Sequence, residues 1–121
     1  MRRHGYPTVY YQFLANVLYA GLQDYIVPLP NTSGIAARFL EKLKIQADLI
    51  YIDGSHDEED VYADLASYWK LLRPTGVLIG DDWGAGQMEF GVICAVNRFM
   101  TKERQLKVQV WDNKWFVQKP A

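Results

Sequence analysis

The sequence predicts an α/β fold with a mostly parallel sheet. Two continuous apolar runs, residues 47–53 and 77–82, each end in carboxylates, the form expected of central parallel strands covered on both faces. Segments with helical spacing of apolar residues lie before, between and after these runs. Strands that alternate with helices in this way are typical of α/β proteins, so we expect helices packed on a central sheet.

The N-terminal part of the chain predicts two helices and a short strand. Residues 10–19 carry an apolar stripe with helical spacing, and Gly21 stands where a C-terminal cap belongs. Residues 25–30 form a short apolar run closed by prolines, which suits the end of a strand because Pro cannot continue a ladder. Residues 31–33 then offer N-cap side chains for a helix over residues 35–43.

The rest of the chain predicts the strands and helices around the candidate site. The acidic residues 58–60 stand in the first turn of a helix, where negative charge complements the helix dipole. Residues 73–76 form a turn between that helix and the second buried run. Residues 106–111 and 114–117 alternate around a turn signal, which predicts a C-terminal antiparallel β-hairpin. In chain order these elements are strand, helix, strand, helix and hairpin, over residues 47–53, 58–72, 77–82, 90–100 and 106–117.

Length and composition exclude several classes of protein. The chain has 121 residues, half of them hydrophobic, which predicts one packed domain over residues 1–121 rather than a disordered chain. Thirteen basic and fourteen acidic residues give a net charge of -1, so we expect no nucleic-acid partner and no membrane partner. The single cysteine, Cys94, forms no internal disulfide. We expect neither a signal peptide nor a membrane-spanning segment, and a cytoplasmic setting.

Three carboxylates follow two neighbouring strands of the predicted sheet. Asp53 ends the first buried run, and Asp81 and Asp82 end the second. In open parallel sheets the strand ends meet at one edge, so we expect these side chains to converge. Converging carboxylates repel one another unless a cation lies between them, and oxygen ligands of this kind select Mg²⁺. His56 lies on the loop after Asp53, where an imidazole can take a proton from a metal-bound hydroxyl group.

Each of these residues also has a structural interpretation. An Asp at a strand end is often a helix N-cap or a turn former, and His56 can cap the following helix. Trp83 is either a wall of the site or a packed loop anchor. A Mg²⁺-dependent phosphoryl transfer on the same acids has less support, because no phosphate-binding loop or suitable nucleophile is evident. The residue pattern alone leaves the choice between a site and a structural role open.

Two motifs carry a resemblance to a known family. The first is Ile-Asp-Gly-Ser-His over residues 52–56, and the second is Gly-Asp-Asp-Trp over residues 80–83. With these motifs, the chain over residues 10–117 resembles class I S-adenosylmethionine-dependent methyltransferases. More narrowly, it is similar to the metal-dependent O-methyltransferase group that includes macrolide sugar methyltransferases and cephalosporin hydroxylase-like proteins.

The resemblance implies a fold, a reaction and a set of residue roles. The fold is a truncated Rossmann-like methyltransferase fold. The reaction is the Mg²⁺-assisted transfer of a methyl group from S-adenosylmethionine to a hydroxyl group of a small molecule. The resemblance implies that Asp53, Asp81 and Asp82 ligate Mg²⁺ and that His56 is the general base. It also implies that Ser33 and Asp53 bind the cofactor, with Ser33 near the adenine.

The chain departs from this family in its N-terminal part. Family members begin with a strand and a glycine-rich loop that contacts the methionine part of the cofactor, and with a second strand whose terminal acid binds the ribose. The chain has neither, so we expect the C-terminal two-thirds of such a domain. The missing strands would lie between residues 25–29 and 48–53, so these two segments pair directly or a second chain fills the gap, which predicts a homo-oligomer. The alternative to an enzyme is an inactive methyltransferase remnant or gene fragment that folds and oligomerises without turnover.

Overall fold

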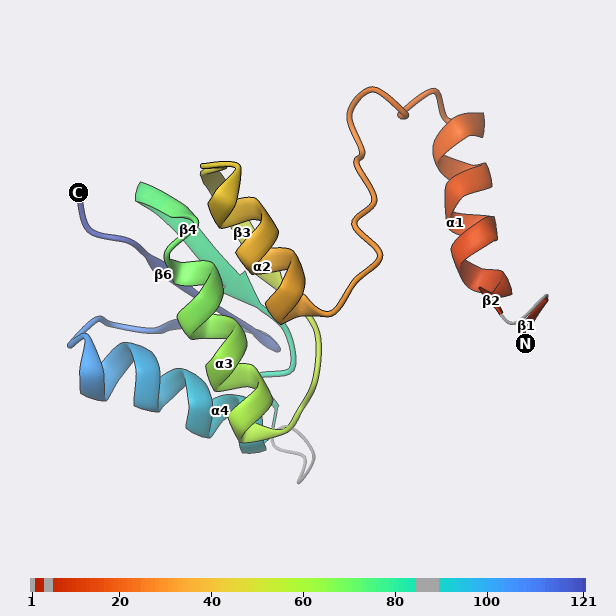
Figure 1. Cartoon of the computed structure of the whole chain (residues 1–121). Coiled ribbons are helices and arrows are strands. Elements are labelled where there is room, and N and C mark those ends of the chain that lie inside the picture. Colours follow the sequence, from red (N-terminus) through yellow and green to blue (C-terminus); the bar gives the residue numbers. More distant parts are fainter. Residues whose placement is uncertain (1, 4–5, 85–89) are drawn as a thin grey trace. The chain divides into compact units, whose positions relative to one another are not determined.

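The computed structural model describes residues 2–3, 6–84 and 90–121 (Figure 1). The chain divides into two compact units, Met1–Pro30 and Asn31–Ala121, which are described in turn. Two compact units can be parts of one domain, so the single domain expected from the chain length stays a prediction. Among the described residues no helix is long and apolar enough to cross a membrane.

The first unit contains one helix and a small β-ribbon. Strands β1 (Arg2–Arg3) and β2 (Tyr6–Pro7) pair antiparallel, and helix α1 (Thr8–Tyr19) follows. Gly21, with a φ of 68°, lies just after α1, as predicted for a residue in the left-handed region. The strand predicted over residues 25–30 is wrong, because this segment has turn and irregular backbone. A strand needs a partner for its backbone N–H and C=O groups, and no strand among the described residues pairs with it.

The second unit is built on a four-stranded sheet in the order β3-β4-β6-β5. Strands β3 (Ala47–Ile52) and β4 (Leu72–Gly80) are parallel, whereas β6 (Lys114–Gln118) pairs antiparallel with both β4 and β5 (Gln109–Trp111). The α/β class is confirmed, but the sheet is mixed rather than mostly parallel. The physical reason is the position of the C-terminal hairpin: β6 lies inside the sheet, so this one strand adds two antiparallel pairings.

Helices precede, separate and follow the strands of this sheet, and two of them begin at a capping side chain. They are α2 (Ser33–Lys42), α3 (Glu58–Trp69), α4 (Phe90–Val96) and the π-helix η1 (Asn97–Glu103). Thr32 is the N-cap of α2, and Asp57 is the N-cap of α3. The helix predicted over residues 90–100 continues through η1 to Glu103. The turn predicted over residues 73–76 lies inside β4, where the register with β3 shifts.

The hydrophobic core lies between the sheet and the helices α3, α4 and η1 (Figure 1). Its largest fully buried side chains come from these elements and are Leu65, Leu72, Leu78, Phe99, Met100 and Trp115. Ile50 and Ile52 of β3 pack against this core, whereas Leu49 and Tyr51 are 60% and 45% exposed. Successive strand residues point to opposite faces, so the described residues of the second unit cover only one face of β3. The prediction that both faces of this strand are covered is therefore met on one side only.

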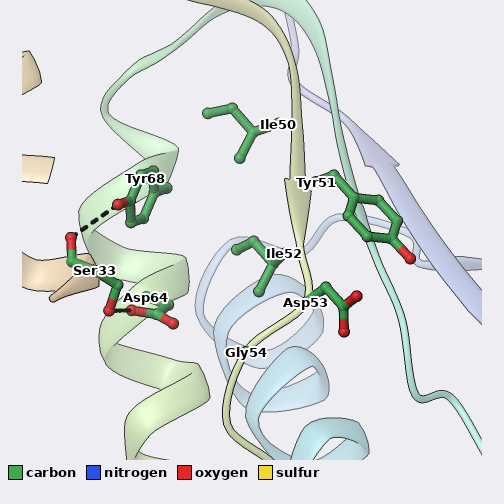
Figure 2. A pocket seen from close by; sticks show the side chains of 8 residues that line it. All are labelled: Ser33, Ile50, Tyr51, Ile52, Asp53, Gly54, Asp64 and Tyr68. Carbon is green, nitrogen blue, oxygen red and sulfur yellow. Dashed lines mark hydrogen bonds between the residues drawn. The ribbon is translucent and has the colours of Figure 1, made fainter. Parts of the chain in front are cut away.

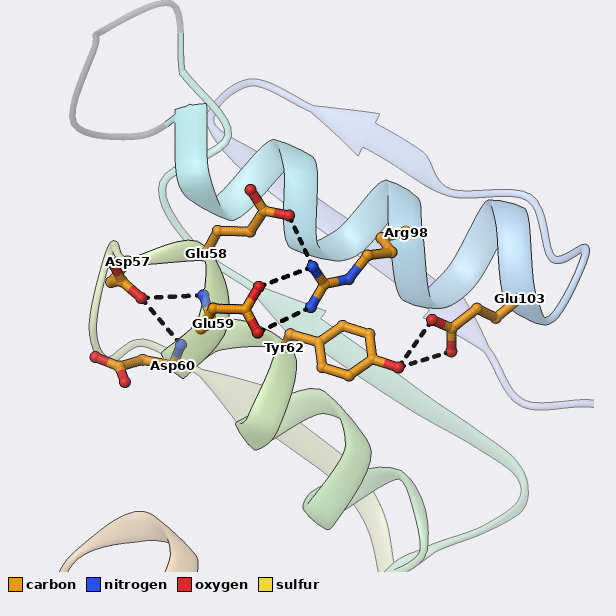
Figure 3. Close-up of polar contacts among 7 residues, drawn as sticks. All are labelled: Asp57, Glu58, Glu59, Asp60, Tyr62, Arg98 and Glu103. Atoms are coloured by element: carbon orange, nitrogen blue, oxygen red, sulfur yellow. Dashed lines mark hydrogen bonds and ion pairs between the residues drawn. The ribbon is translucent and has the colours of Figure 1, made fainter.

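A polar cluster joins α3 to η1 (Figure 3). The guanidinium group of Arg98 lies 3.9 Å from the ring centre of Tyr62, and its Nη1 donates to Glu58 at 3.0 Å and Glu59 at 2.9 Å. The Tyr62 hydroxyl group donates to the two carboxylate oxygens of Glu103 at 2.8 and 2.9 Å. The hydrogen bonds from Arg98 hold the pKa of Glu59 below its usual range. These contacts hold the first turn of α3, which directly follows the loop after β3.

Candidate functional site

The carboxyl ends of β3 and β4 form the candidate site. Ile52 pairs with Gly80 at the end of the parallel register, and the backbone N–H of Asp81 donates to the carbonyl group of Ile52 at 3.1 Å. Asp53 and Asp81 therefore follow the two strands at one edge of the sheet, where ligands bind in open α/β sheets. The strand ends meet as the sequence predicts, but Asp81 pairs with Lys114, whereas the described ion pairs give Asp53 no basic partner.

Asp81 is surrounded by hydrogen-bond donors. Its Oδ1 lies 2.6 Å from Nζ of Lys114 and accepts the backbone N–H of Asp82 at 2.8 Å. The Tyr51 hydroxyl group donates to Oδ2 at 3.1 Å. The hydrogen bond from Lys114 contributes most to holding the pKa of Asp81 below its usual range, and the other bonds add to it. The same bond raises the pKa of Lys114. The two side chains therefore stay charged as an ion pair over a wide pH range.

His56 and Asp82 form a second pair. Nε2 of His56 lies 2.8 Å from Oδ2 of Asp82, and the two side chains are 36% and 23% exposed. Asp82 has a φ of 66°, a left-handed conformation that Asp tolerates better than most residues. His56 does not cap α3, because Asp57 holds that position. The Asp82 carboxylate is thus placed to orient the imidazole ring.

Close packing anchors the two loops of the site. A Cβ atom on Gly91 would lie 2.3 Å from the carbonyl oxygen of His56 and 3.0 Å from the backbone nitrogen of Glu58, so only glycine lets α4 approach this loop. Trp83 packs against the hydrophobic core, which supports its interpretation as a loop anchor. Its backbone N–H donates to the carbonyl group of Asn113 at 2.9 Å. The backbone of both loops is therefore held in place by neighbouring elements.

A cavity of about 230 Å³ lies beside Asp53 (Figure 2). Its walls come from α2, β3, the following loop and α3, and are formed by Ser33, Ile50, Tyr51, Ile52, Asp53, Gly54, Asp64 and Tyr68. The Ser33 hydroxyl group donates to Oδ1 of Asp64 at 2.6 Å, and the Tyr68 hydroxyl group donates to the Ser33 carbonyl group at 2.8 Å. Burial and the nearby Asp64 carboxylate raise the pKa of Tyr68, so its hydroxyl group remains a donor.

The predicted site residues fall into separate groups. Ser33 and Asp53 line the cavity, whereas Asp82 pairs with the imidazole described above. Asp81 faces Lys114. Among the described residues, which include all three predicted metal ligands, no group of three or more His, Cys, Asp or Glu side chains could hold a metal ion. As placed, the residues do not fit the predicted Mg²⁺ site, because Asp81 and Asp82 already pair with basic side chains.

Four further side chains of the site are not predicted by the sequence. Lys114 and Tyr51 contact Asp81, and Asp64 and Tyr68 line the cavity. Asp64 and Tyr68 lie one helical turn apart on α3, so helical spacing is a signal that places both on one side of that helix. No local signal places Lys114, because its position depends on the pairing of β6 with β4.

The motifs that form this edge of the sheet lie within a region that matches a known family. A family model described as a methyltransferase domain matches residues 4–83. The matched region includes α1, α2, β3, α3 and β4 and both motifs, over residues 52–56 and 80–83. It ends before α4 and the C-terminal hairpin. No curated protein matches the chain.

Proposed function

The chain belongs to the methyltransferase-domain family, and we propose that it is a class I enzyme that transfers a methyl group from S-adenosylmethionine to a hydroxyl group of a small molecule. The observation that carries this proposal is the pair of His56 and Asp82 at the same sheet edge as the cavity beside Asp53. Methyl transfer to a hydroxyl group needs a pocket for the donor and a base for the acceptor. Ligands of open α/β sheets bind at this edge, and the family match supplies the reaction class.

The cavity beside Asp53 suits the adenosine part of the cofactor. Ile50 and Ile52 offer apolar contacts to a flat base, and the carboxylates of Asp53 and Asp64 can accept hydrogen bonds from amino and ribose hydroxyl groups. A neighbouring hollow of about 470 Å³ shares Ser33 and Asp64 with the cavity and continues along α3. Together the two hollows provide room for a ligand larger than a nucleoside. When bound, S-adenosylmethionine supplies the methyl group on its sulfonium sulfur.

His56 is the proposed general base. The carboxylate of Asp82 lies 2.8 Å from Nε2 of His56 and accepts a hydrogen bond from the N–H group at that position. Nδ1 is then unprotonated and can take the proton of an acceptor hydroxyl group. The same carboxylate stabilises the imidazolium cation that forms. His56 thereby prepares the acceptor oxygen as the nucleophile. This proton transfer needs no Mg²⁺, and the two carboxylates that follow β4 already have basic partners.

Binding of S-adenosylmethionine with micromolar affinity is the first expected result. Titration calorimetry on wild-type protein of known solution mass measures this affinity. A second assay then measures the transfer of a labelled methyl group from the cofactor to a panel of hydroxyl compounds. Asp64→Asn removes a carboxylate acceptor from the cavity and should weaken binding by roughly tenfold. Asp48→Asn makes the same change at the opposite end of β3, where the side chain is 79% exposed, and should bind as wild type does. No binding at about 1 mM cofactor contradicts the proposal and supports an inactive remnant.

We also propose that a second copy of the chain covers the free edge of β3. Among the described strands β3 pairs with β4 alone, and an exposed apolar edge favours association. Sedimentation should therefore show a dimer of the wild type and a monomer of Leu49→Lys, because Leu49 is 60% exposed on β3. Val110→Lys makes a similar change on β5, at the other edge of the sheet, and should leave the dimer intact. A monomeric wild type contradicts this proposal.

A further inference from the structure

We infer that the ammonium group of Lys114 is the resident cation of this site, in the position beside Asp81 that a divalent metal ion would need. The site then functions without a divalent metal. The contacts of Asp81, Asp82 and Lys114 carry this inference, and its meaning for catalysis rests on the proposed methyl transfer.

Both carboxylate oxygens of Asp81 are already engaged by donors of the chain itself. Nζ of Lys114 lies 2.6 Å from Oδ1, which also accepts the backbone N–H of Asp82. The Tyr51 hydroxyl group takes Oδ2. A metal ion at this carboxylate would lie next to the ammonium group, and two cations that close repel each other strongly. The positive charge that three converging acids would require is thus supplied, at Asp81, by a side chain.

Lys114 is held in this position by the sheet and by the hairpin turn. It is the first residue of β6, and the next residue, Trp115, pairs with Gly80 at the end of β4. Nζ of Lys114 also donates to Oδ1 of Asn113 at 2.9 Å. The carbonyl group of Asn113 in turn accepts the backbone N–H of Trp83. The ammonium group therefore has two oxygen partners, one on Asp81 and one on Asn113. The backbone beside Lys114 is bonded to residues on both sides of Asp81 and Asp82, at Gly80 and Trp83.

Asp82 is not free to complete a metal site with its neighbour. Its carboxylate pairs with Nε2 of His56 at 2.8 Å, whereas the carboxylate of Asp81 pairs with Lys114. Asp53 is then the one acid of the predicted set without a basic partner among the described contacts. Mg²⁺ is bound in proteins through carboxylate and other oxygen ligands in near-ideal octahedral geometry, and while Lys114 occupies Asp81 only Asp53 is left to offer a carboxylate. Lys114 is accordingly a positioning residue that neutralises Asp81 and holds the loop that carries Asp82.

Titration calorimetry with MgCl₂ and with MnCl₂, in the absence of S-adenosylmethionine, tests this inference. Wild-type protein should show no saturable binding at millimolar metal. Lys114→Gln removes the ammonium group and frees Asp81, so divalent binding should appear and should be stronger than in the wild type by roughly tenfold or more. The double variant Lys114→Gln/Asp81→Asn should lose this binding again. Lys107→Gln changes the same charge at an exposed lysine outside the site and should behave as wild type does.

Two results would overturn the inference. The first is saturable Mg²⁺ binding by the wild type that Asp81→Asn abolishes, because Asp81 would then be a metal ligand in the presence of Lys114. The second is a folded Lys114→Gln variant, checked by its urea midpoint, that gains no metal affinity. The wild-type titration decides the question even where Lys114→Gln does not fold. Neither result bears on cofactor binding, so failure of this inference is distinguishable from failure of the proposed methyl transfer.

Discussion

Replacement of His56 by alanine should lower the rate of methyl transfer by about 10²–10⁴-fold, the range in which a positioned general base contributes. The reason is the contact of 2.8 Å between Nε2 of His56 and Oδ2 of Asp82, which leaves the other ring nitrogen to take the acceptor proton. Alanine removes that group but no side chain that lines the cavity beside Asp53. Initial rates with labelled S-adenosylmethionine measure the loss, and calorimetry should show unchanged cofactor affinity.

Substitution of the partner carboxylate provides the matched comparison. Asp82→Asn keeps the shape of the side chain but weakens its hold on the imidazole, so its rate should lie between those of the wild type and His56→Ala. Asp48→Asn, the same change at the far end of β3, should keep the full rate. A His56→Ala variant that transfers methyl groups at the wild-type rate excludes His56 as the base. Loss of cofactor affinity in that variant would instead place the imidazole in the binding site.

The largest effect on stability is expected for Gly80→Ala, which should lower the free energy of unfolding by about 3 kcal/mol. A Cβ atom at this position would lie 2.2 Å from a ring carbon of Trp115, far inside the contact distance. Trp115 is 0% exposed and pairs directly with Gly80 across the strands β4 and β6. Because the core is closely packed, neither the indole ring nor the strand can move away without disturbing its neighbours.

Urea unfolding measures this loss of stability. Gly34→Ala is the matched control, because a Cβ atom there meets nothing within 4 Å and the residue lies in the first turn of α2. Its free energy of unfolding should stay within about 1 kcal/mol of the wild type, or rise, since alanine favours a helix. If Gly80→Ala unfolds at the same urea concentration as the wild type, the indole ring of Trp115 does not lie against Gly80.

The helices and strands that are specified by local sequence patterns are the ones whose predictions agree best with the structure. Helix α3 follows from acids in its first turn and an apolar stripe, and β3 follows from a continuous apolar run. Such signals act between residues a few positions apart, so they need no knowledge of the rest of the fold. The cap of α3 lies one residue from His56, at Asp57, and here the sequence left a choice that the backbone geometry decides.

The two predictions about strands that the structure corrects share one physical cause, which is that a strand needs a partner strand. Residues 25–30 have the composition of a strand, yet no described strand pairs with them and they form none. The C-terminal hairpin forms as predicted, although its first strand begins at Gln109 rather than at residue 106, and its insertion beside β4 makes the sheet mixed. Pairing joins residues that are distant in the chain, and the alternation of apolar residues in β6 is the same for every neighbour it could have.

The sequence by itself determined the α/β class, the two motifs that lie within the region matching the methyltransferase-domain family, and the meeting of Asp53 and Asp81 at one sheet edge. Only the tertiary structure decided which partner each acid takes. Asp81 pairs with Lys114 because the register of β6 against β4 brings that side chain to it, and Asp82, which has a left-handed backbone, pairs with His56. The charge of a carboxylate can be read from a sequence, whereas the cation that neutralises it depends on strand register and backbone direction.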